Sequence, residues 1–474
     1  MAASSRPYDL VVIGAGSGGM GASIAAAQLG LRVCLLESSP DLGGNANRGG
    51  VNCWEPGTGG TGLPFEIYKR LKRIPQSVGI YTFGRHQRDH PGFPGGEAKL
   101  DPTKRYADSL RRFTFPGENR VEIQHGVPFE PVAYSRVLSD MLAETGNVAI
   151  LLNSAVKEVE VDGRKISGLR LANDSVVRGA AYVDATASIS VARLAGCDVA
   201  IGRESRETYG ETGAPVEADD QINAVTQIYR VDPHYGAPAI EPLSDDISEA
   251  CWWNEKFPSA VFNEYPGGGL NVNMLPTMEG REYLRLGCEA AKVECARRIR
   301  AHWHWVQSVL PEMQDYQMTW CAPALGVREG HRLIGRYILT QTDLDATLRE
   351  QTHDDVICIA DHAKDVHGEA HVSKELTFPY GVPYRCLLPK EFDNLLVACR
   401  GASFSSIAAS SCRLSRTIMQ LGQAAGTAAA IAKIRGIAVC DVPGSALREA
   451  LRKQHVQLEW PAPPELQAHL EDED

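Results

Sequence analysis

The amino-acid sequence predicts an α/β fold whose centre is a parallel β-sheet. Residues 10–13 are a short apolar run that ends at a cluster of glycines, as a buried strand of a parallel sheet does. Residues 22–29 are predicted as the following helix, and residues 32–36 are a second apolar run. Strand, helix and strand in this order indicate a βαβ unit at the start of the chain.

The glycines of this unit follow the spacing GxGxxG. Gly14 permits the tight turn after the strand, Gly16 lets the backbone approach a pyrophosphate, and Gly19 lets the helix pack closely on the strand. The helix begins beside the phosphates, which its N-terminal N–H groups can bind. Glu37 ends the second strand, where its carboxylate can accept hydrogen bonds from a ribose. The predicted dinucleotide site also includes Ser17 and Gly18.

Size and charge narrow the class of protein. The 474 residues are enough for two or three domains. The formal net charge is −11, and acids and bases are interspersed without a basic stripe, which argues against nucleic acid as a partner. There is no apolar run of about 18 residues and no secretory signal, so neither a membrane span nor export is expected. Twelve scattered cysteines without CxxC indicate reduced thiols and a cytoplasmic location.

Residues 38–54 are rich in glycine and amide side chains. Such a stretch lets the backbone run close to a flat or charged ligand. A flexible loop is the alternative, but small and amide residues without a lysine run favour a ligand cradle. Its predicted contacts are Gly43, Gly44, Asn45, Arg48, Gly49 and Gly50.

Residues 55–120 are predicted as a long excursion with one short helix over 64–73. Its arginines and histidines between positions 70 and 90 suit a mouth for an anionic substrate, although a solvated surface is the preferred explanation. The elements expected next are a helix over 134–145, a strand over 148–152, a β-meander over 157–180, a buried strand over 181–187 and a helix over 190–195.

The composition changes between residues 205 and 325, where acids, tryptophan and proline rise and glycine falls. Strands over 224–231 and 270–274 and a long helix over 281–309 indicate an inserted α+β substrate or cap domain. Cys288, Cys295, His302 and His304 lie on that helix. A zinc site is conceivable, but no dense cluster of ligands exists, so a pair of core thiols is preferred and no metal is predicted.

The composition of the first part returns after residue 325. Expected elements are a helix over 328–341, strands over 356–360 and 394–399, and a long helix over 413–435. One further helix and an acidic tail without fixed structure follow. The predicted domains are residues 1–204 and 326–440, which together form one dinucleotide-binding domain, the insert 205–325, and the C-terminal part 441–474.

Several segments are similar to those of a known family. They are GGNANRGGVN after Glu37, GVREGHRLIGRYILT, DVHG, PYRCLLPKEFDNLLVACRGASFSS and RLSRTIMQLGQAAGTAAAIA. The chain thereby resembles the FAD-dependent oxidoreductases of the second glutathione-reductase-type group, which includes fumarate-reductase and succinate-dehydrogenase flavoproteins. The resemblance implies FAD and a Rossmann-like FAD-binding domain with a β-meander. It also implies cofactor contacts at Val156, Ala185, Thr186, Arg400, Arg413 and Gly422.

The sequence departs from relatives at two places near the expected site. Relatives usually have DATGDGD after the second flavin strand, whereas this chain has DATASIS over residues 184–190. Relatives often have a histidine and an acid before the last long helix, where Ser406 and Ile407 stand here. Catalytic residues therefore have to be assigned from this chain's own side chains.

A substrate that gives a hydride to a flavin must also lose a proton, so the site needs a base that titrates near neutrality. His367 is the predicted base, and Glu329 is the alternative. Asp365 is a candidate to orient the ring, although alternate residues of an extended segment point apart. Arg328 and Arg385 are predicted to hold a carboxylate or polarise a carbonyl.

The start of the helix over 413–435 is expected to aim backbone N–H groups at the negative charge of a reduced flavin. Arg413 would add a cation there, and a surface ion pair is its alternative role.

The predicted function is dehydrogenation of a small polar, hydroxylated or carboxylated substrate by hydride transfer to FAD. The alternatives are the reverse reduction of an activated double bond and a non-enzymatic carrier with the same fold. No second GxGxxG follows a strand, so electrons are expected to pass to an external acceptor or oxygen and not through a dedicated NAD(P)H domain. The sequence leaves the oligomeric state open.

Overall fold

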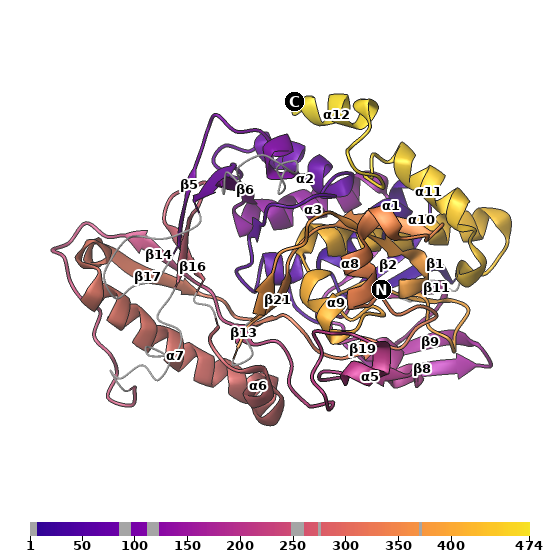
Figure 1. Cartoon of the computed structure of the whole chain (residues 1–474), viewed down its shortest axis with the longest axis horizontal. Helices are drawn as coiled ribbons and strands as arrows, with labels where there is room; N and C mark the ends of the chain where they lie inside the picture. The colour runs from indigo at the N-terminus through magenta and orange to yellow at the C-terminus, as the bar shows by residue number, and fades with distance from the viewer. Residues whose placement is uncertain (1–6, 85–95, 111–122, 248–259, 274–275, 369–371) are drawn as a thin grey trace.

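The computed structural model describes residues 7–84, 96–110, 123–247, 260–273, 276–368 and 372–474. Figure 1 shows a body that contains the parallel sheet and its helices, and a lobe that projects to one side and carries the longest helix of the insert. Both ends of the described chain lie on the body.

The centre of the body is a five-stranded parallel sheet in the order β24-β11-β1-β2-β7. Its strands are β1 (Tyr8–Ile13), β2 (Val33–Leu36), β7 (Val148–Leu151), β11 (Gly179–Asp184) and β24 (Leu395–Val397). The α/β class and the parallel arrangement that the first 37 residues predict are therefore confirmed.

The two faces of the sheet bury different layers. Leu10 and Val12 face the helices, whereas Val11 and Ile13 face the β-meander, because successive side chains of a strand point to opposite faces. The meander is a three-stranded sheet of β8 (Val156–Asp162), β9 (Lys165–Leu171) and β10 (Val176–Val177). Together with α4 (Ser190–Ala195), it forms the layer predicted from the sequence.

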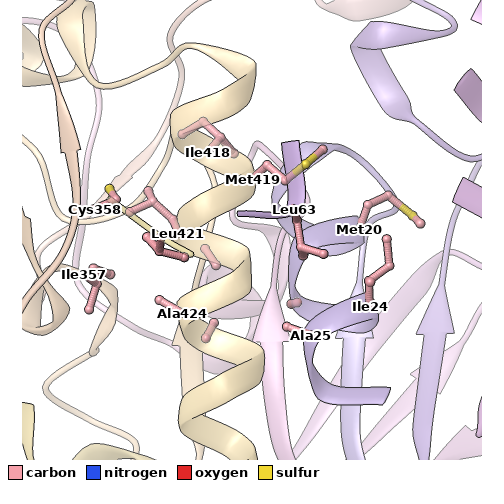
Figure 2. Close-up of a cluster of buried hydrophobic side chains, with 14 of the residues drawn as sticks. Met20, Ile24, Ala25, Leu63, Ile357, Cys358, Ile418, Met419, Leu421 and Ala424 are labelled. Carbon is pink, nitrogen blue, oxygen red and sulfur yellow. The ribbon is translucent and has the colours of Figure 1, made fainter. Parts of the chain in front are cut away.

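Helices α1 (Ser17–Gln28) and α10 (Ser415–Arg435) pack against each other on the helical face. A Cβ atom at Gly422 would lie 1.9 Å from the backbone oxygen of Gly18, and one at Gly426 would lie 2.3 Å from that of Ala22. Only glycine allows so close a crossing. Figure 2 shows Met20 and Ile24 of α1 among the buried side chains of this layer. The remaining helices of the body include α2 (Leu63–Lys72), α3 (Pro131–Thr145) and α8 (Gln341–Glu350).

An eight-stranded sheet connects the lobe to the body, in the order β17-β14-β16-β15-β5-β4-β6-β3. Four strands precede the meander in sequence: β3 (Cys53–Trp54), β4 (Tyr81–Gly84), β5 (Gly96–Leu100) and β6 (Ile123–Pro128). Four follow it: β14 (Tyr229–Pro233), β15 (Val261–Glu264), β16 (Leu270–Asn273) and β17 (Tyr316–Cys321). The two halves meet where β5 pairs in parallel with β15.

The single helix expected over 281–309 is two helices, α6 (Gly280–Leu286) and α7 (Cys288–Val309). The chain breaks at Gly287, whose φ of 76° lies in the left-handed region that glycine adopts without strain. The expectation of two core thiols on this helix is half right: Cys295 is buried, but Cys288 is exposed. The inner side of α7 packs on the lobe sheet, with Ile299 and Trp303 in its core.

The helix expected over residues 328–341 is wrong. This segment contains the short strands β18 (Gly326–Val327) and β19 (Arg332–Leu333), which pair with β13 (Val225–Thr226) and β12 (Val199–Ala200). A helix begins only at Gln341, behind a capping box formed by Thr340 and Asp343. The short strands of this segment pair with strands that lie far away in the sequence.

The C-terminal part is more ordered than the sequence indicates. It forms α11 (Gly444–Lys453) and α12 (Pro464–Glu471), and Glu473 accepts a hydrogen bond of 2.7 Å from the backbone N–H of Tyr106. None of the helices in the described residues is long and apolar enough to cross a membrane.

Candidate active site

A cavity of about 700 Å³ runs from the ends of the central strands to the lobe sheet. One end is lined by the glycine motif and the end of β2. The other end is lined by the loop 53–58, the hairpin β15–β16, the segment 361–367 and the start of α10. The cavity therefore connects the dinucleotide motif with most of the polar side chains singled out below.

The glycine end of the cavity suits an anion. Gly16 caps α1 without any side-chain hydrogen bond, and no acidic residue stands in the first turn of the helix. A Cβ atom at Gly16 would meet no atom within 4 Å, so the backbone faces open space. The first N–H groups of α1 and the positive end of its dipole can thus bind a phosphate.

Glu37 stands at the end of β2 and lines the cavity, as the sequence predicts. Its carboxylate also accepts hydrogen bonds from the backbone N–H groups of Ala15, at 2.6 Å, and Ser39, at 2.7 Å. Glu37 therefore fixes the turn that carries the glycine motif, a role that the motif alone did not reveal.

The predicted cofactor residues divide into two groups. Those that line the cavity are Gly14, Gly16, Ser17, Gly18, Glu37, Gly44, Asn45, Gly50, Val156, Ala185, Thr186, Arg400 and Arg413. Those that lie outside its lining are Gly19, Gly43, Arg48, Gly49 and Gly422. Arg48, for example, forms an ion pair with Asp41 at 2.8 Å.

Gly422 requires a correction. It lies in the middle of α10, where its hydrogen atoms touch the backbone of α1 and not the cavity. Its small size is needed for helix packing, which is the physical reason a glycine stands there. The first turn of α10, Ser415 to Ile418, lines the cavity instead.

His367 and Asp365 lie together at the other end of the cavity. His367 Nε2 is 2.7 Å from Asp365 Oδ2, and Arg413 Nη2 is 2.6 Å from the same oxygen. The three side chains are 12–14% exposed. Contact between residues two apart is achieved because the strand β21 (Lys364–Val366) ends before His367. Arg413 is part of the cavity wall and not of a surface ion pair.

The charges of this group follow from their surroundings. The pKa of His367 is lowered to about 4, chiefly by burial and next by the positive charge of Arg328, while Asp365 opposes both. Burial alone would raise the pKa of Asp365, but the hydrogen bond with His367 and the charge of Arg413 hold it well below its usual range. At neutral pH the site therefore holds a neutral imidazole beside a carboxylate.

Arg328 lies in the cavity wall and donates hydrogen bonds to neutral oxygens only. Its Nη1 bonds the backbone oxygen of Ala224 at 2.9 Å and the hydroxyl of Thr226 at 2.7 Å. Its pKa is lowered to about 9, chiefly by burial and next by the charge of Arg413, so it remains cationic at neutral pH. A half-buried cation without a bonded carboxylate among the described residues is a natural partner for an anion.

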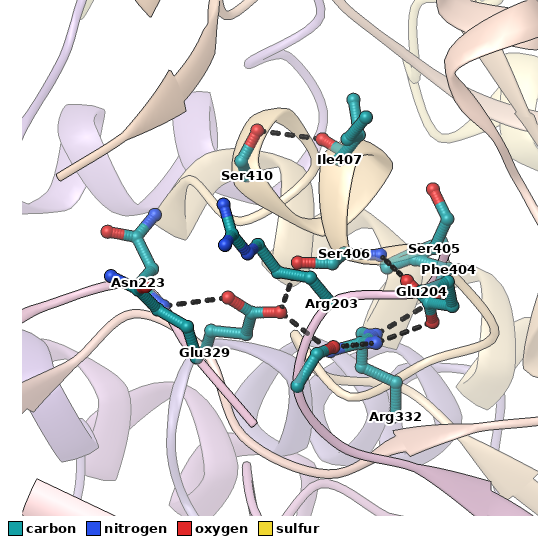
Figure 3. Close-up of polar contacts among 12 residues, drawn as sticks. Arg203, Glu204, Asn223, Glu329, Arg332, Phe404, Ser405, Ser406, Ile407 and Ser410 are labelled. Atoms are coloured by element: carbon teal, nitrogen blue, oxygen red, sulfur yellow. Dashed lines mark hydrogen bonds and ion pairs between the residues drawn. The ribbon is translucent and has the colours of Figure 1, made fainter. Parts of the chain in front are cut away.

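Glu329, the alternative base, lies outside the cavity lining. Its carboxylate accepts hydrogen bonds from Arg332 at 2.6 Å, from Ser406 at 2.7 Å and from the backbone N–H of Asn223 at 2.8 Å (Figure 3). Burial raises its pKa, as expected of a base, but the arginine beside it and the lack of access to the cavity point to a structural role. Arg332 is held by Glu204 as well.

Arg385 also requires a correction. Its side chain is 44% exposed and binds Asp355 at 3.0 Å, away from the cavity lining. The sequence placed it near the site because it follows a family-like proline and tyrosine. In the structure Tyr384 is buried, and the partly exposed arginine pairs with the buried carboxylate of Asp355.

The sequence interpretation missed a second histidine–carboxylate pair. His362 Nε2 lies 3.5 Å from Glu55 Oε2, and both residues line the cavity. His362 is buried, and its Nδ1 has no hydrogen-bond partner. Burial would raise the pKa of Glu55, but His362 and Arg413 lower it to about 2. Half of Glu55 is reached by water, because it faces the cavity space and not the protein interior.

One signal could have revealed this pair. Asp361, His362, Asp365 and His367 fall within seven positions, directly after the buried strand β20 (Val356–Ala360). A dense run of titratable groups at the end of a buried strand is typical of a functional site. Within the described residues, no group of three or more His, Cys, Asp or Glu side chains is placed to hold a metal ion.

Asn223 was not predicted either, and it contacts the backbone of both His367 and Asp365. Its Oδ1 accepts a hydrogen bond from the backbone N–H of His367 at 3.0 Å, and its Nδ2 donates one to the backbone oxygen of Asp365 at 3.0 Å. The same residue is bound by Glu329. Asn223 therefore joins the buried ionic cluster of Figure 3 to the loop that carries His367.

Comparison with known proteins identifies the family. Residues 9–451 match the family described as FAD dependent oxidoreductase. An NADH:fumarate oxidoreductase from Klebsiella pneumoniae (strain 342) is 25% identical over 185 residues, which cover 36% of this chain and 19% of that protein. A 3-oxosteroid 1-dehydrogenase from Mycobacterium tuberculosis (strain ATCC 25618 / H37Rv) is 33% identical over 81 residues, or 17% and 13% of the two chains. These matches span less than a fifth of the relatives' length.

Among solved structures, a geranylgeranyl bacteriochlorophyll reductase-like protein from Thermoplasma acidophilum aligns with a TM-score of 0.46 and 12% identity, over 95% of this chain and 84% of that chain. The family match extends over nearly the whole chain. The open glycine turn, the uncapped start of α1 and Glu37 fit the adenosine and pyrophosphate of the family's cofactor. The chain belongs to the family of FAD-dependent oxidoreductases.

Proposed function

We propose that this enzyme dehydrogenates a small polar substrate that carries a hydroxyl group and a carboxylate, with His367 as the base. The observation that carries the proposal is the close pair of His367 and Asp365 in the same cavity as the dinucleotide motif. FAD, when bound, supplies the hydride acceptor. The protein's part is to bind and orient the substrate and to take its proton.

The cavity residues of the body are proposed to hold the cofactor. Gly14, Gly16, Ser17 and Gly18 would bind the pyrophosphate, and Glu37 the ribose. Further along, Gly44, Asn45, Gly50, Val156, Ala185, Thr186 and Arg400 would complete the site. Arg400 supports this assignment, because its buried Nε lacks a hydrogen-bond partner and suits an anionic group.

The start of α10 is proposed to face the flavin ring. Leu414 caps the helix without a side-chain hydrogen bond, and no acidic residue stands in its first turn. The N–H groups of residues 415–418, which line the cavity, would stabilise negative charge on the ring. Arg413 would add to this field while it holds Asp365.

His367 is proposed to remove the hydroxyl proton as the hydride leaves the carbon. The O–H and C–H bonds break, a carbonyl forms, and the proton is held on the imidazole. Because Nε2 faces Asp365, the neutral ring donates there and Nδ1 carries the lone pair that accepts the proton. Asp365 then stabilises the charged ring, and Asn223 keeps both residues in place.

Arg328 is proposed to bind the substrate's carboxylate. It is cationic, it lines the cavity and it bonds only neutral oxygens. The similarity to an NADH:fumarate oxidoreductase supports a second candidate, the reverse reduction of an activated double bond in an unsaturated acid. The same residues would then bind the acid and return a proton. An external carrier or oxygen is proposed as the electron acceptor.

The test is anaerobic reduction of the bound flavin by a panel of hydroxy acids, followed by absorbance. In the variant His367→Ala, FAD stays bound, because His367 lies away from the glycine end, and reduction slows about 10²–10⁴-fold, the usual contribution of a general base. The matched control is His234→Ala in the lobe, outside the cavity lining, which reduces at the native rate.

A His367→Ala enzyme that reduces its flavin at the native rate across the pH range contradicts the assignment. In that case the pair Glu55–His362 becomes the base to test, since it lines the same cavity. Reduction of unsaturated acids in the reverse assay, with a reduced dye as the electron donor, decides between the two directions.

A further inference from the structure

The hairpin β15–β16 turns a row of amide side chains toward the cavity. Val261 pairs with Asn273 and Asn263 with Asn271, so these four side chains share one face of the hairpin, and all four line the cavity. Phe262 and Val272 point the other way into the core under α7. The face of the hairpin that lines the cavity is therefore mainly polar, whereas its opposite face is apolar.

Two of these amides have an unsatisfied acceptor. The Oδ1 atoms of Asn263 and Asn273 are buried and have no hydrogen-bond partner among the residues that the structure describes. Asn271 differs, because its Nδ2 donates to the backbone oxygen of Gly50 at 2.8 Å and to Asn52 Oδ1 at 2.8 Å. Asn271 thus ties the glycine loop to the lobe. Buried amide oxygens are nearly always paired in native proteins, so the other two indicate a bound group with donors.

The cofactor can meet part of this need. FAD has one N–H donor on its oxidised ring and hydroxyl donors on its ribityl chain and riboses. Asn263 and Asn273 lie on different strands of the hairpin, and both line the same cavity as His367 and Arg328. A substrate hydroxyl is the other donor that this cavity would hold.

The charges in the cavity select the type of donor. Arg328 and Arg413 are cations of the same wall; Arg413 is paired with Asp365, whereas Arg328 has no bonded carboxylate among the described residues. An ammonium group beside Arg328 would meet an uncompensated repulsion, whereas a hydroxyl would not. A hydroxyl also matches the amide, because it donates to Oδ1 and can accept from Nδ2 of the same side chain.

We infer that the substrate is a polyhydroxylated carboxylate, a compound of the sugar-acid class. This inference rests on the proposed function: Arg328 binds the carboxylate and His367 takes the proton of the hydroxyl that is oxidised. Asn263 and Asn273 then bind hydroxyls further along the chain. A site built to hydrogen-bond a hydroxyl discriminates strongly against the analogue that lacks it, because its own polar groups are left unpaired.

The experiment compares two sets of acids of equal length. Four- to six-carbon aldonates and the corresponding 2-hydroxyalkanoates, which keep the carboxylate and one hydroxyl, are titrated anaerobically into the holoenzyme. Binding is followed by the difference spectrum of the flavin and reduction by its bleaching. We expect at least one aldonate to exceed its 2-hydroxyalkanoate about 10²-fold or more in the ratio of reduction rate to Kd.

The variants Asn263→Leu and Asn273→Leu, which keep the size of the side chain, locate the effect. Each is expected to reduce the preference for the aldonate at least about tenfold, with FAD content and the visible spectrum unchanged. A variant that loses FAD or shifts the spectrum while the preference persists assigns that asparagine to the cofactor; both behaving so overturns the inference.

Other outcomes also overturn it. Equal use of the two sets, preferential use of 2-amino acids, or no reduction by any aldonate excludes the sugar-acid class. These results leave the proposed base untouched, because His367→Ala is judged with whichever substrate reduces the flavin. Conversely, an aldonate preference with a fully active His367→Ala enzyme supports the substrate class and rejects the base.

Discussion

His367 shows how one residue's surroundings set both its charge and its availability. Burial and the charge of Arg328 depress its pKa, while Asp365 contacts the ring and Asn223 accepts a hydrogen bond from the backbone N–H of His367. An imidazole with so low a pKa is neutral over the physiological range, and the pKa of about 4 already includes the opposing effect of Asp365. The arginine that is proposed to hold the substrate therefore also tunes the base.

This coupling predicts the pH dependence of flavin reduction. The reaction needs neutral His367, so its acid limb lies well below pH 6.5 in the wild type, near the pKa of about 4. Arg328→Gln removes a positive charge, which makes protonation of His367 easier and raises its pKa, so the limb moves to higher pH.

The measurement is the ratio of reduction rate to Kd as a function of pH, with the same substrate for both proteins. Weaker binding in Arg328→Gln changes the height of the profile, whereas the charge effect changes its midpoint. Arg336→Gln is the control, since Arg336 binds Asp393 outside the cavity. A limb that stays at the same pH in Arg328→Gln refutes the coupling.

The helix α10 combines two tasks along its length. Its first turn lines the cavity, and its middle crosses α1 at Gly422 and Gly426. Since α1 carries the glycine motif at its own start, the spacing of the two helices sets the width of the cavity at the glycine end. Gly422 and Gly426 thereby affect the cavity although neither residue lines it.

Gly422→Ala tests this link. Helix propensity alone would favour alanine by about 1 kcal/mol, but its Cβ would lie 1.9 Å from a backbone oxygen that cannot move without the helix. We expect the clash to dominate and to destabilise the protein by about 1–3 kcal/mol, seen as a lower Tm in the protein with FAD and without it.

Comparing the Tm of the FAD-bound protein with that of the protein without FAD distinguishes a packing role of Gly422 from a cofactor-binding role. A glycine that served the cofactor would lower only the Tm of the FAD-bound form. Gly236→Ala in a surface loop, where the nearest atom is a histidine ring at 3.2 Å, should leave both unchanged.

The described residues contain one parallel sheet of the dinucleotide-binding type, and that sheet is proposed to bind FAD. The rest of the cavity is bounded by the lobe. A second dinucleotide would need its own glycine turn beside the flavin, and the sequence contains none after a later strand.

We therefore predict that NADH and NADPH reduce the bound flavin more slowly than enzymes usually turn over, below about 1 per second. Stopped-flow absorbance under anaerobic conditions measures this rate, and photoreduction of the same sample shows that its flavin is competent. Reduction by either nucleotide at about 10–1000 per second would overturn the prediction.

The features predicted from sequence are those determined by neighbouring residues. The turn at Gly14 and Gly16 and the acid at Glu37 follow from a local sequence pattern. The same pattern predicts the strand–helix–strand unit. His367 and Arg328 were predicted because they stand in segments similar to a family, and both line the cavity. Arg385 shared that signal but binds Asp355, which no local pattern reveals.

Features created by distant pairing escaped prediction. Residues 328–340 have helix-like apolar spacing, yet β19 pairs with β12, and Arg332 joins Glu204 and Glu329 in a buried cluster. The pair of Glu55 and His362, and the amide face of β15–β16, depend on segments that meet only in the folded chain. Their residue types were visible in the sequence, but their partners were not.

The parallel pairing of β5 with β15 has a consequence for building chimeras. The eight-stranded sheet takes half of its strands from residues 53–128. Residues 205–325 therefore cannot be exchanged as an independent unit. If residues 205–325 were replaced by those of a relative, β5 would have to pair with a strand that did not evolve with it. New substrate ranges are therefore more readily engineered by exchanging single side chains on the inner face of the hairpin than by transplanting the lobe.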